Sequence, residues 1–284
     1  MEFYFVSTSH LDVRIWFKDD EDFKAGMNCV AILVARTGVR VIAFILMSNH
    51  VHFLLECSRK EAEDFINGFK KQYSFYYSKK YGVKELLRRN SVDIQQVGLA
   101  PESLERVVAY INMNSVAARI CLHSTGYRWG TGRVFFNADR PRGTRIGDLS
   151  LRAQRRLLHS TVKLPEDWLV GEDGYILPES FVCVGFVEAL FRNPARMNYF
   201  LNTSSKAKMV RENNGPSFRD QIIAGAIVDM CQTLFRKNSV ASLQREEKKE
   251  LILQLQRRFG ADLNQICRVT EIEYSEAAKL LESF

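Results

Sequence analysis

The six cysteines of this 284-residue sequence are widely separated, and no two of them form a CxxC pair. Closely spaced cysteines are typical of disulfide-rich secreted domains and of zinc sites, so this sequence favours neither class. Scattered cysteines usually pack as small hydrophobic side chains. We therefore expect a reducing compartment, and thiols that carry no chemistry.

Long apolar runs are also missing. No stretch reaches the roughly 18 apolar residues needed to span a bilayer. The N-terminal MEFYFVSTSHLDVRIWF has neither the basic start nor the small-residue cleavage site of a secretory signal. Internal repeats and helicase-type phosphate loops are absent as well. These absences predict a cytoplasmic protein with no membrane partner.

The composition is that of a soluble protein with a sizeable core. Hydrophobic residues make up 46% of the chain, and its length favours about two domains. Lysine and arginine number 40 against 33 acidic residues, for a net charge of +7. This excess fits a polyanionic partner such as nucleic acid.

Hydrophobic periodicity predicts the elements of the first half. A helix over 19–38 begins with acidic residues and ends at Gly38, and a buried strand, a Ser48-Asn49 turn and a returning strand follow. The expected elements are strands near 3–9, 39–47 and 50–56, and helices over 19–38, 60–81 and 101–120. We expect an α+β catalytic domain: a ferredoxin-like antiparallel sheet with helices on one face.

The second half looks helical. The segment NADRPRGTRIGD at 137–148 is rich in Arg, Gly and Pro, so we place a boundary there, between a catalytic domain over 1–140 and an all-α C-terminal region over 148–284. The order of helices and turns predicted in 218–284 is that of a helix-turn-helix. It weakly resembles the DNA-binding domain of replication initiators. A helical bundle that supports the catalytic domain or a dimer remains open.

Two histidines lie one residue apart in LMSNHVHFLLE. Alternation along a strand sends His50 and His52 to the same face, which suggests a metal or a phosphate. Two imidazoles leave a divalent metal short of ligands. In the 101–120 helix, Arg106, Tyr110 and Asn114 are spaced four apart on one face, so the Asn114 amide oxygen could complete a site beside the Tyr110 phenol.

These stretches resemble the single-tyrosine transposases marked by His-hydrophobic-His (HUH), in particular the REP-associated tyrosine transposases. The blocks that carry the resemblance cover residues 3–136 in the expected order: YFVSTS...RIWFKDDEDF, VRVIAFILMSNHVHFLLE, FKKQYSFYYSKKYG, VVAYINMNSVAARI and GYRWGTGRVFF. This sequence departs from the family at two positions, where Ser48 and Ser115 stand in place of a common Pro. A changed helix kink at Ser115 would displace Asn114 or Tyr110.

The resemblance implies a site and a reaction. His50 and His52 match the paired metal ligands, Asn114 the polar third ligand and Tyr110 the catalytic tyrosine. The implied reaction cleaves and rejoins single-stranded DNA through a 5′-phosphotyrosine link, with Mg²⁺ or Mn²⁺ at the scissile phosphate. The implied partners are single-stranded or hairpin DNA and a second copy of the chain, as a homodimer.

Other residues are candidates for holding DNA phosphates, because basic side chains supply most of the affinity for nucleic acid. They are Arg106, Lys70, Lys71, Arg88, Arg89, Arg257 and Arg258. Basic runs on helices are more often only solvated surfaces.

Several alternatives remain open. Tyr73, Tyr76 and Tyr77 are rival nucleophiles, although their spacing favours packing or base stacking. The chain could be a domesticated regulator that binds chromosomal hairpins, or a metal-dependent nuclease in which water replaces Tyr110. Relaxase or rolling-circle initiation suits the order of the blocks less well.

Overall fold

The structure is a computed structural model that describes residues 2–8, 14–84, 87, 90–139, 141–207 and 218–282. Its first elements are β1 (Phe3–Thr8), α1 (Asp20–Thr37), β2 (Arg40–Met47), β3 (His50–Glu56), α2 (Arg59–Tyr81) and β4 (Val92–Val97). The sheet has the order β2-β3-β1-β4, and each neighbouring pair is antiparallel. This βαββαβ order is the ferredoxin-like arrangement. The expected fold class is therefore confirmed.

Strand β4 was not expected from the sequence. Three of its six residues VDIQQV are exposed and only Val97 is buried, and the strand pairs with β1 at the edge of the sheet. A polar edge strand carries little of the hydrophobic alternation that identifies a strand. β4 forms because it pairs with β1, a strand that is distant in the sequence.

Helices α1 and α2 begin and end where their sequences specify. The Asp19 side chain accepts a hydrogen bond from the backbone N–H of Asp22, and Ser58 and Glu61 form a capping box at the start of α2. Both helices end at a glycine in the left-handed conformation, Gly38 and Gly82.

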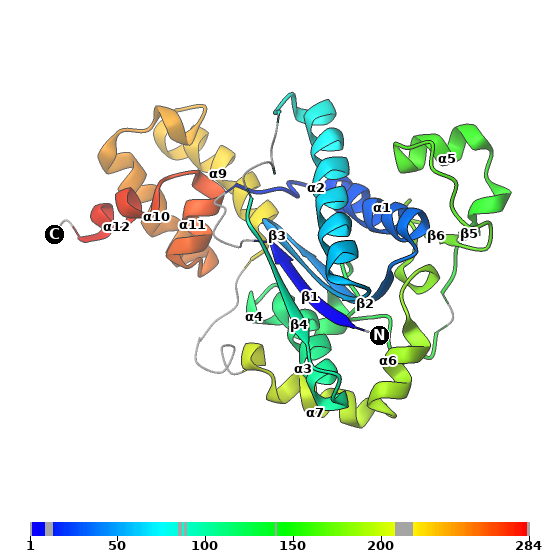
Figure 1. Cartoon of the computed structure of the whole chain (residues 1–284). Helices are drawn as coiled ribbons and strands as arrows, with labels where there is room; N and C mark the ends of the chain where they lie inside the picture. Colours follow the sequence, from blue (N-terminus) through cyan, green and yellow to red (C-terminus); the bar gives the residue numbers. More distant parts are fainter. Residues whose placement is uncertain are drawn as a thin grey trace.

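One face of the sheet is packed by α1 and α2 (Figure 1). The ring of Phe53 in β3 contacts Phe65 and Phe69 of α2, at centroid distances of 5.4 and 5.7 Å. Gly26 lets α1 approach closely, because an added Cβ would lie 2.6 Å from Phe17 and 2.9 Å from Leu46. We call this surface of the sheet the packing face.

The opposite face is covered in part by α3 (Pro101–Asn112), which is followed by the short helix α4 (Asn114–Ala117). A single helix over 101–120 was expected, and this expectation is wrong, because the helix breaks at Met113. The Asn114 side-chain amide donates to the carbonyls of Tyr110 (2.8 Å) and Ile111 (3.2 Å). It thereby takes the acceptors that backbone N–H groups would use in a continuous helix.

The remaining chain is mainly helical, as expected, apart from a two-residue ladder. Its elements are η1 (Ser124–Gly126), β5 (Thr144–Arg145), η2 (Ile146–Asp148), α5 (Leu151–Leu158), β6 (Leu169–Val170), η3 (Pro178–Ser180), α6 (Val184–Phe191), α7 (Pro194–Thr203), α9 (Asp220–Phe235), η4 (Val240–Ser242), α10 (Arg245–Phe259), α11 (Leu263–Thr270) and α12 (Tyr274–Glu282).

The buried core of the sheet continues past residue 148. Trp168, Ile176 and Phe191 belong to the same buried cluster as the strands. The outer edge of β2 is covered by residues from both sides of that position, since Leu46 N donates to Trp129 O and Cys183 N donates to Val41 O. The division of domains predicted near 137–148 stays a prediction.

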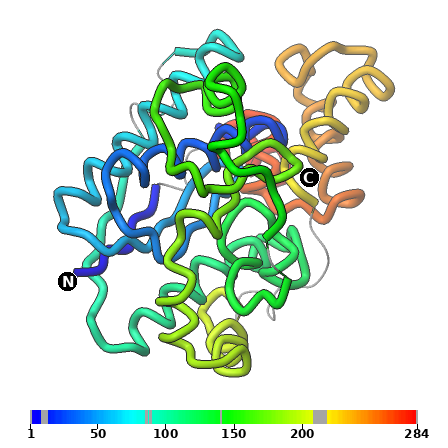
Figure 2. Tube along the Cα trace, turned by 90° about the vertical axis from the view of Figure 1, so that its right-hand side faces the viewer, coloured from blue at the N-terminus to red at the C-terminus, as the bar shows by residue number. Residues whose placement is uncertain are grey.

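Helices α9 to α12 have a buried cluster of their own, which includes Ile223, Leu251 and Ile266. They gather on one side of the molecule, drawn in yellow to red in Figures 1 and 2. Gln221 Nε2 donates to the carbonyl of Phe17 (2.5 Å), and Arg219 pairs with Asp20 (3.2 Å), so this bundle contacts the start of α1. Among the described residues, no helix is both long and apolar enough to cross a bilayer.

Candidate functional site

The hairpin β2–β3 places the two histidines as the sequence predicted. Ser48 and Asn49 form its turn, and β3 begins at His50. The carbonyl of Ser48 accepts hydrogen bonds from the backbone N–H groups of Trp16 and Phe17 (2.8 and 3.1 Å), which holds the turn against the chain that precedes α1. The serine in place of a proline therefore leaves the hairpin closed.

The register of the sheet aligns polar side chains opposite the packing face. Ser7 of β1 pairs with His52 of β3 on one side and with Asp93 of β4 on the other. Directly paired residues point to the same side of a sheet. His52, Ser7 and Asp93 therefore share one surface, which we call the site face.

His50 and His52 lie side by side, with ring centroids 4.9 Å apart and ring planes at 82°. His50 Nδ1 is 2.9 Å from the Asn49 side-chain oxygen, a hydrogen bond that orients the ring. His52 is buried and stacks on Phe5 at 5.6 Å. The pair is thus held by its neighbours before any ligand binds.

Tyr110 of α3 meets this pair. Its ring lies edge-on to His52 at a centroid distance of 5.9 Å and edge-on to Phe5 at 5.7 Å. The side chain is half-buried, and this burial raises the pKa of the Tyr110 phenol. Ionisation of the phenol therefore needs positive charge nearby.

A pocket of about 610 Å³ opens beside these groups. It is lined by Phe5, Ser7, His52, Asp93, Gln95, Arg106, Val107, Tyr110, Phe200, Thr203, Ser204 and Ser205. Three predicted site residues, His52, Arg106 and Tyr110, meet here, whereas His50 and Asn114 are not part of the lining. The side-chain amide nitrogen of buried Asn114 is engaged by main-chain carbonyls.

Sequence reasoning missed several residues of this pocket. Asp93 and Gln95 come from the unexpected strand β4, and they are joined by a hydrogen bond of 2.5 Å. Thr203 ends α7, and Ser204 and Ser205 follow it. The ammonium group of the next residue, Lys206, lies 4.9 Å from the centroid of the Tyr110 ring. No local signal in the sequence connects either segment to Tyr110.

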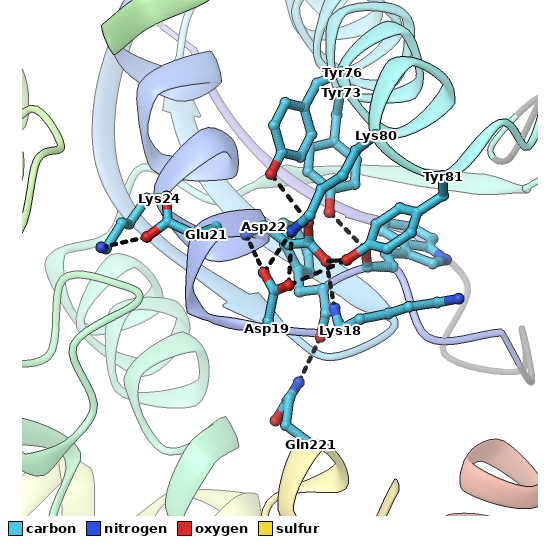
Figure 3. A network of polar contacts seen from close by, with 12 residues as sticks. Lys18, Asp19, Glu21, Asp22, Lys24, Tyr73, Tyr76, Lys80, Tyr81 and Gln221 are labelled. Carbon is cyan, nitrogen blue, oxygen red and sulfur yellow. Dashed lines mark hydrogen bonds and ion pairs between the residues drawn. The ribbon is translucent and has the colours of Figure 1, made fainter. Parts of the chain in front are cut away.

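The rival tyrosines of α2 lie beneath the opposite, packing face. Tyr73 is fully buried, and its hydroxyl donates to the carbonyl of Trp16 (2.6 Å). Tyr76 donates to Asp22 (3.1 Å), within a polar network that links α1 to α2 (Figure 3). Burial raises the pKa of both phenols. These roles are structural.

The basic residues proposed for DNA binding are dispersed. Arg106 is exposed and lies 3.7 Å from Glu102 at the pocket. Lys70 and Lys71 line a different hollow of about 780 Å³, on α2, and Lys70 donates to the carbonyl of Asn90. Arg257 and Arg258 are exposed at the end of α10 in the C-terminal bundle, and Arg88 and Arg89 lie outside the described residues.

Within the described part of the chain, no three or more His, Cys, Asp or Glu side chains gather as a metal site. The two imidazoles fit a divalent metal as neighbouring ligands on one strand. A complete coordination shell would need amide, phosphate or water oxygens in addition.

Part of this chain is similar to a known protein family. Residues 14–114 match the model of the family described as "Transposase IS200 like". This segment contains His50, His52, Tyr110 and Asn114, and the match supports the family predicted from the sequence. Members of this family are DNA-cleaving and DNA-joining enzymes that generally use a divalent metal.

Comparisons with curated proteins and with solved structures give less information than the family match. Curated proteins gave no match. The chain is similar to a solved structure described as "Structure of the REP associates tyrosine transposase bound to a REP hairpin", with 11% identity, a TM-score of 0.38, and coverage of 59% of this chain and 84% of that one. A likeness at this score carries no argument about the site.

Proposed function

We propose that this protein cleaves and rejoins single-stranded DNA with Tyr110 as the nucleophile and a divalent metal at His50 and His52. The observation that carries the proposal is the edge-on contact of Tyr110 with His52 beside an open pocket. A phenol next to paired imidazoles in a segment of the IS200-like family fits the chemistry of that family.

In the proposed reaction, the Tyr110 oxygen attacks a phosphodiester. The bond from Tyr110 to phosphorus forms as the bond from phosphorus to the 3′-oxygen breaks. The phenol releases one proton to water, and the 3′-oxygen takes one up. The link is a 5′-phosphotyrosine, and the free 3′-hydroxyl can reverse the step without ATP because the bond energy is conserved.

His50 and His52 would hold the metal, with the Asn114 amide oxygen as the third protein ligand. A divalent metal, Mg²⁺ or Mn²⁺, would supply Lewis-acid chemistry toward the scissile phosphate there, an effect worth roughly several kcal/mol. Asn114 lies one residue beyond the break in α3, so its position depends on that break. The remaining coordination positions would take DNA or water oxygens.

The proposed substrate is DNA with a hairpin next to the cleavage site. The net charge of +7 supports a polyanionic partner, and a hairpin is what the family resemblance of residues 3–136 implies. The homodimer and the helix-turn-helix remain predictions. Helix α12 carries Glu276 and Glu282 beside a single lysine, Lys279, which does not favour it as a helix that reads duplex DNA.

The test is an adduct assay with end-labelled single-stranded hairpin DNAs and Mn²⁺ or Mg²⁺. Label should migrate with the protein on a denaturing gel, and the adduct should be lost in Tyr110→Phe, in His52→Ala and with a chelator. Tyr199→Phe is the matched control, because Tyr199 is an exposed tyrosine on α7. Cleaved DNA without an adduct that persists in Tyr110→Phe would favour water as the nucleophile. Binding without cleavage across a broad pool would favour a hairpin-binding regulator.

A further inference from the structure

The far wall of the Tyr110 pocket comes from the second half of the chain. Phe200 of α7 and residues 203–205 line the pocket, and Lys206 places its ammonium group 4.9 Å from the centroid of the Tyr110 ring. All of these residues lie outside the segment 14–114 that matches the transposase family. The pocket is therefore completed by chain that the family match does not describe.

This wall is fixed to the helix that carries Tyr110. Arg196 of α7 makes two hydrogen bonds to the fully buried carboxylate of Glu105 in α3, at 2.5 and 2.8 Å. The Arg196 guanidinium also lies 5.3 Å from the centroid of Phe200. A bidentate pair of this kind specifies both distance and orientation. The Arg196–Glu105 pair therefore fixes the position of α7 relative to α3.

The position of Lys206 follows from a local cap. The Ser204 hydroxyl oxygen accepts a hydrogen bond from the backbone N–H of Ala207 (3.1 Å), and its hydroxyl donates to the carbonyl of Leu201 (2.9 Å). Ser204 therefore organises the turn that carries Lys206 toward Tyr110.

Within the part of the chain that the structure describes, the charge of Lys206 has no ion-pair partner. Among the described residues, no carboxylate lies within ion-pair distance of its ammonium group, although Asp93 lines the sheet side of the same pocket. The side chain is partly buried, and this burial lowers the pKa of Lys206. An anion that entered the pocket would compensate the buried charge.

We propose that Lys206 is a further active-site residue, whose ammonium group pairs with the scissile DNA phosphate while the Tyr110 oxygen attacks it. This inference rests on the proposed function. The bond changes are those already given, and Lys206 stays protonated throughout. Its positive charge offsets the negative charge that develops on the phosphate oxygens. The pocket is then formed by β1, the segment that matches the family, and α7 with the residues that follow it.

The experiment compares the wild type with Lys206→Gln and Lys206→Arg in single-turnover adduct formation, using a hairpin DNA that the wild type cleaves. We expect Lys206→Gln to slow adduct formation at saturating DNA by about tenfold or more, because one preorganised charge is lost. Lys206→Arg should restore the rate to within a few fold, and the Kd for DNA should change less than the rate. Lys60→Gln is the charge-matched control, because Lys60 is exposed on α2 and pairs with Asp64.

Three results would overturn the inference. A wild-type rate in Lys206→Gln would exclude a role in the step, while the Tyr110 proposal would stand. Equal losses in Lys206→Gln and Lys206→Arg would assign the effect to the shape of the wall and not to charge. Absence of an adduct in the wild type would defeat the proposed function and this inference together. Melting curves followed by tryptophan fluorescence identify any variant that fails to fold.

Discussion

The two faces of the sheet are built from alternate residues of the same strands, yet they differ in content. Beneath the packing face, Val51, Phe53 and Leu55 of β3 are fully buried against the helices. On the site face, His50 and His52 of the same strand meet a half-buried tyrosine and a pocket. Alternate side chains of β3 therefore have different roles. Those on the packing face fill the core and stabilise the fold, and the histidines on the site face border an open pocket.

The largest expected effect is on the packing face. Phe53→Ala should lower the free energy of unfolding by about 3–5 kcal/mol, because it removes a fully buried ring and leaves a cavity. The measurement is urea unfolding followed by tryptophan fluorescence. All three tryptophans, Trp16, Trp129 and Trp168, lie in the core that contains the sheet, so the signal reports this core and not the C-terminal bundle.

The matched control is Phe75→Ala. Phe75 lies on the same helix as the partners of Phe53, but it is 70% exposed. Its replacement should change the free energy of unfolding by no more than about 0.5 kcal/mol. Similar losses for the two variants would contradict the division into a packed and an open face.

A second prediction concerns Asp22, which is fully buried at the start of α1 (Figure 3). Its carboxylate accepts hydrogen bonds from Lys80, Tyr81 and Tyr76 of α2, at 2.8, 2.9 and 3.1 Å. Asp22→Ala should cost about 2–3 kcal/mol in the same unfolding assay, because these donors lose a charged and fully buried acceptor. The rate of adduct formation by the folded fraction should not change. A loss of activity without a loss of stability would mean that this network contributes to the reaction.

These contrasts show what the sequence could predict. The helix caps, the hairpin turn and the shared face of His50 and His52 follow from local patterns, so those elements are as expected. Strand β4 and the break at Met113 depend on a neighbouring strand and on the side chain of Asn114. Local periodicity does not contain such information.

For the site as well, local patterns could be predicted from the sequence and contacts between distant segments could not. The spacing of His50 and His52 could be read along one strand. The contact of Tyr110 with His52 brings together elements far apart in the chain, so the spacing of residues on α3 and the family resemblance could only suggest it. Lys206 lies 96 positions after Tyr110, and nothing in its own sequence context distinguishes it from other lysines.

A third prediction addresses the site face. Arg196→Met should lower the free energy of unfolding by about 1–2 kcal/mol, because it leaves the buried carboxylate of Glu105 without its bidentate partner. Adduct formation should slow as well, since α7 carries the wall of the pocket. Adding Glu105→Gln should recover part of the stability, because a neutral amide is less costly to bury. A double variant no more stable than Arg196→Met would show that Glu105 has another counter-charge.

The smallest expected effect is the pH dependence contributed by Asp19. Partial burial alone raises the pKa of Asp19, but hydrogen bonds from Lys80 and from the backbone of Asp22 outweigh it and hold the pKa below its ordinary value of 3.8. Stability from a depressed carboxylate pKa is present above the unfolded value and is lost as the pH falls through the folded one.

Asp19→Asn keeps a helix-capping side chain but removes this charge. Melting temperatures should therefore fall less steeply below about pH 4 in the variant than in the wild type. The side chain is half exposed, so the difference should be small. Because Asp19 caps α1, which packs on the face of the sheet opposite α3 and Tyr110, the pH profile of adduct formation should stay the same. A shifted pH profile of activity would mean that charges beneath the packing face influence the chemistry on the site face. The two faces would then differ in how their side chains pack, but they would not be electrostatically independent.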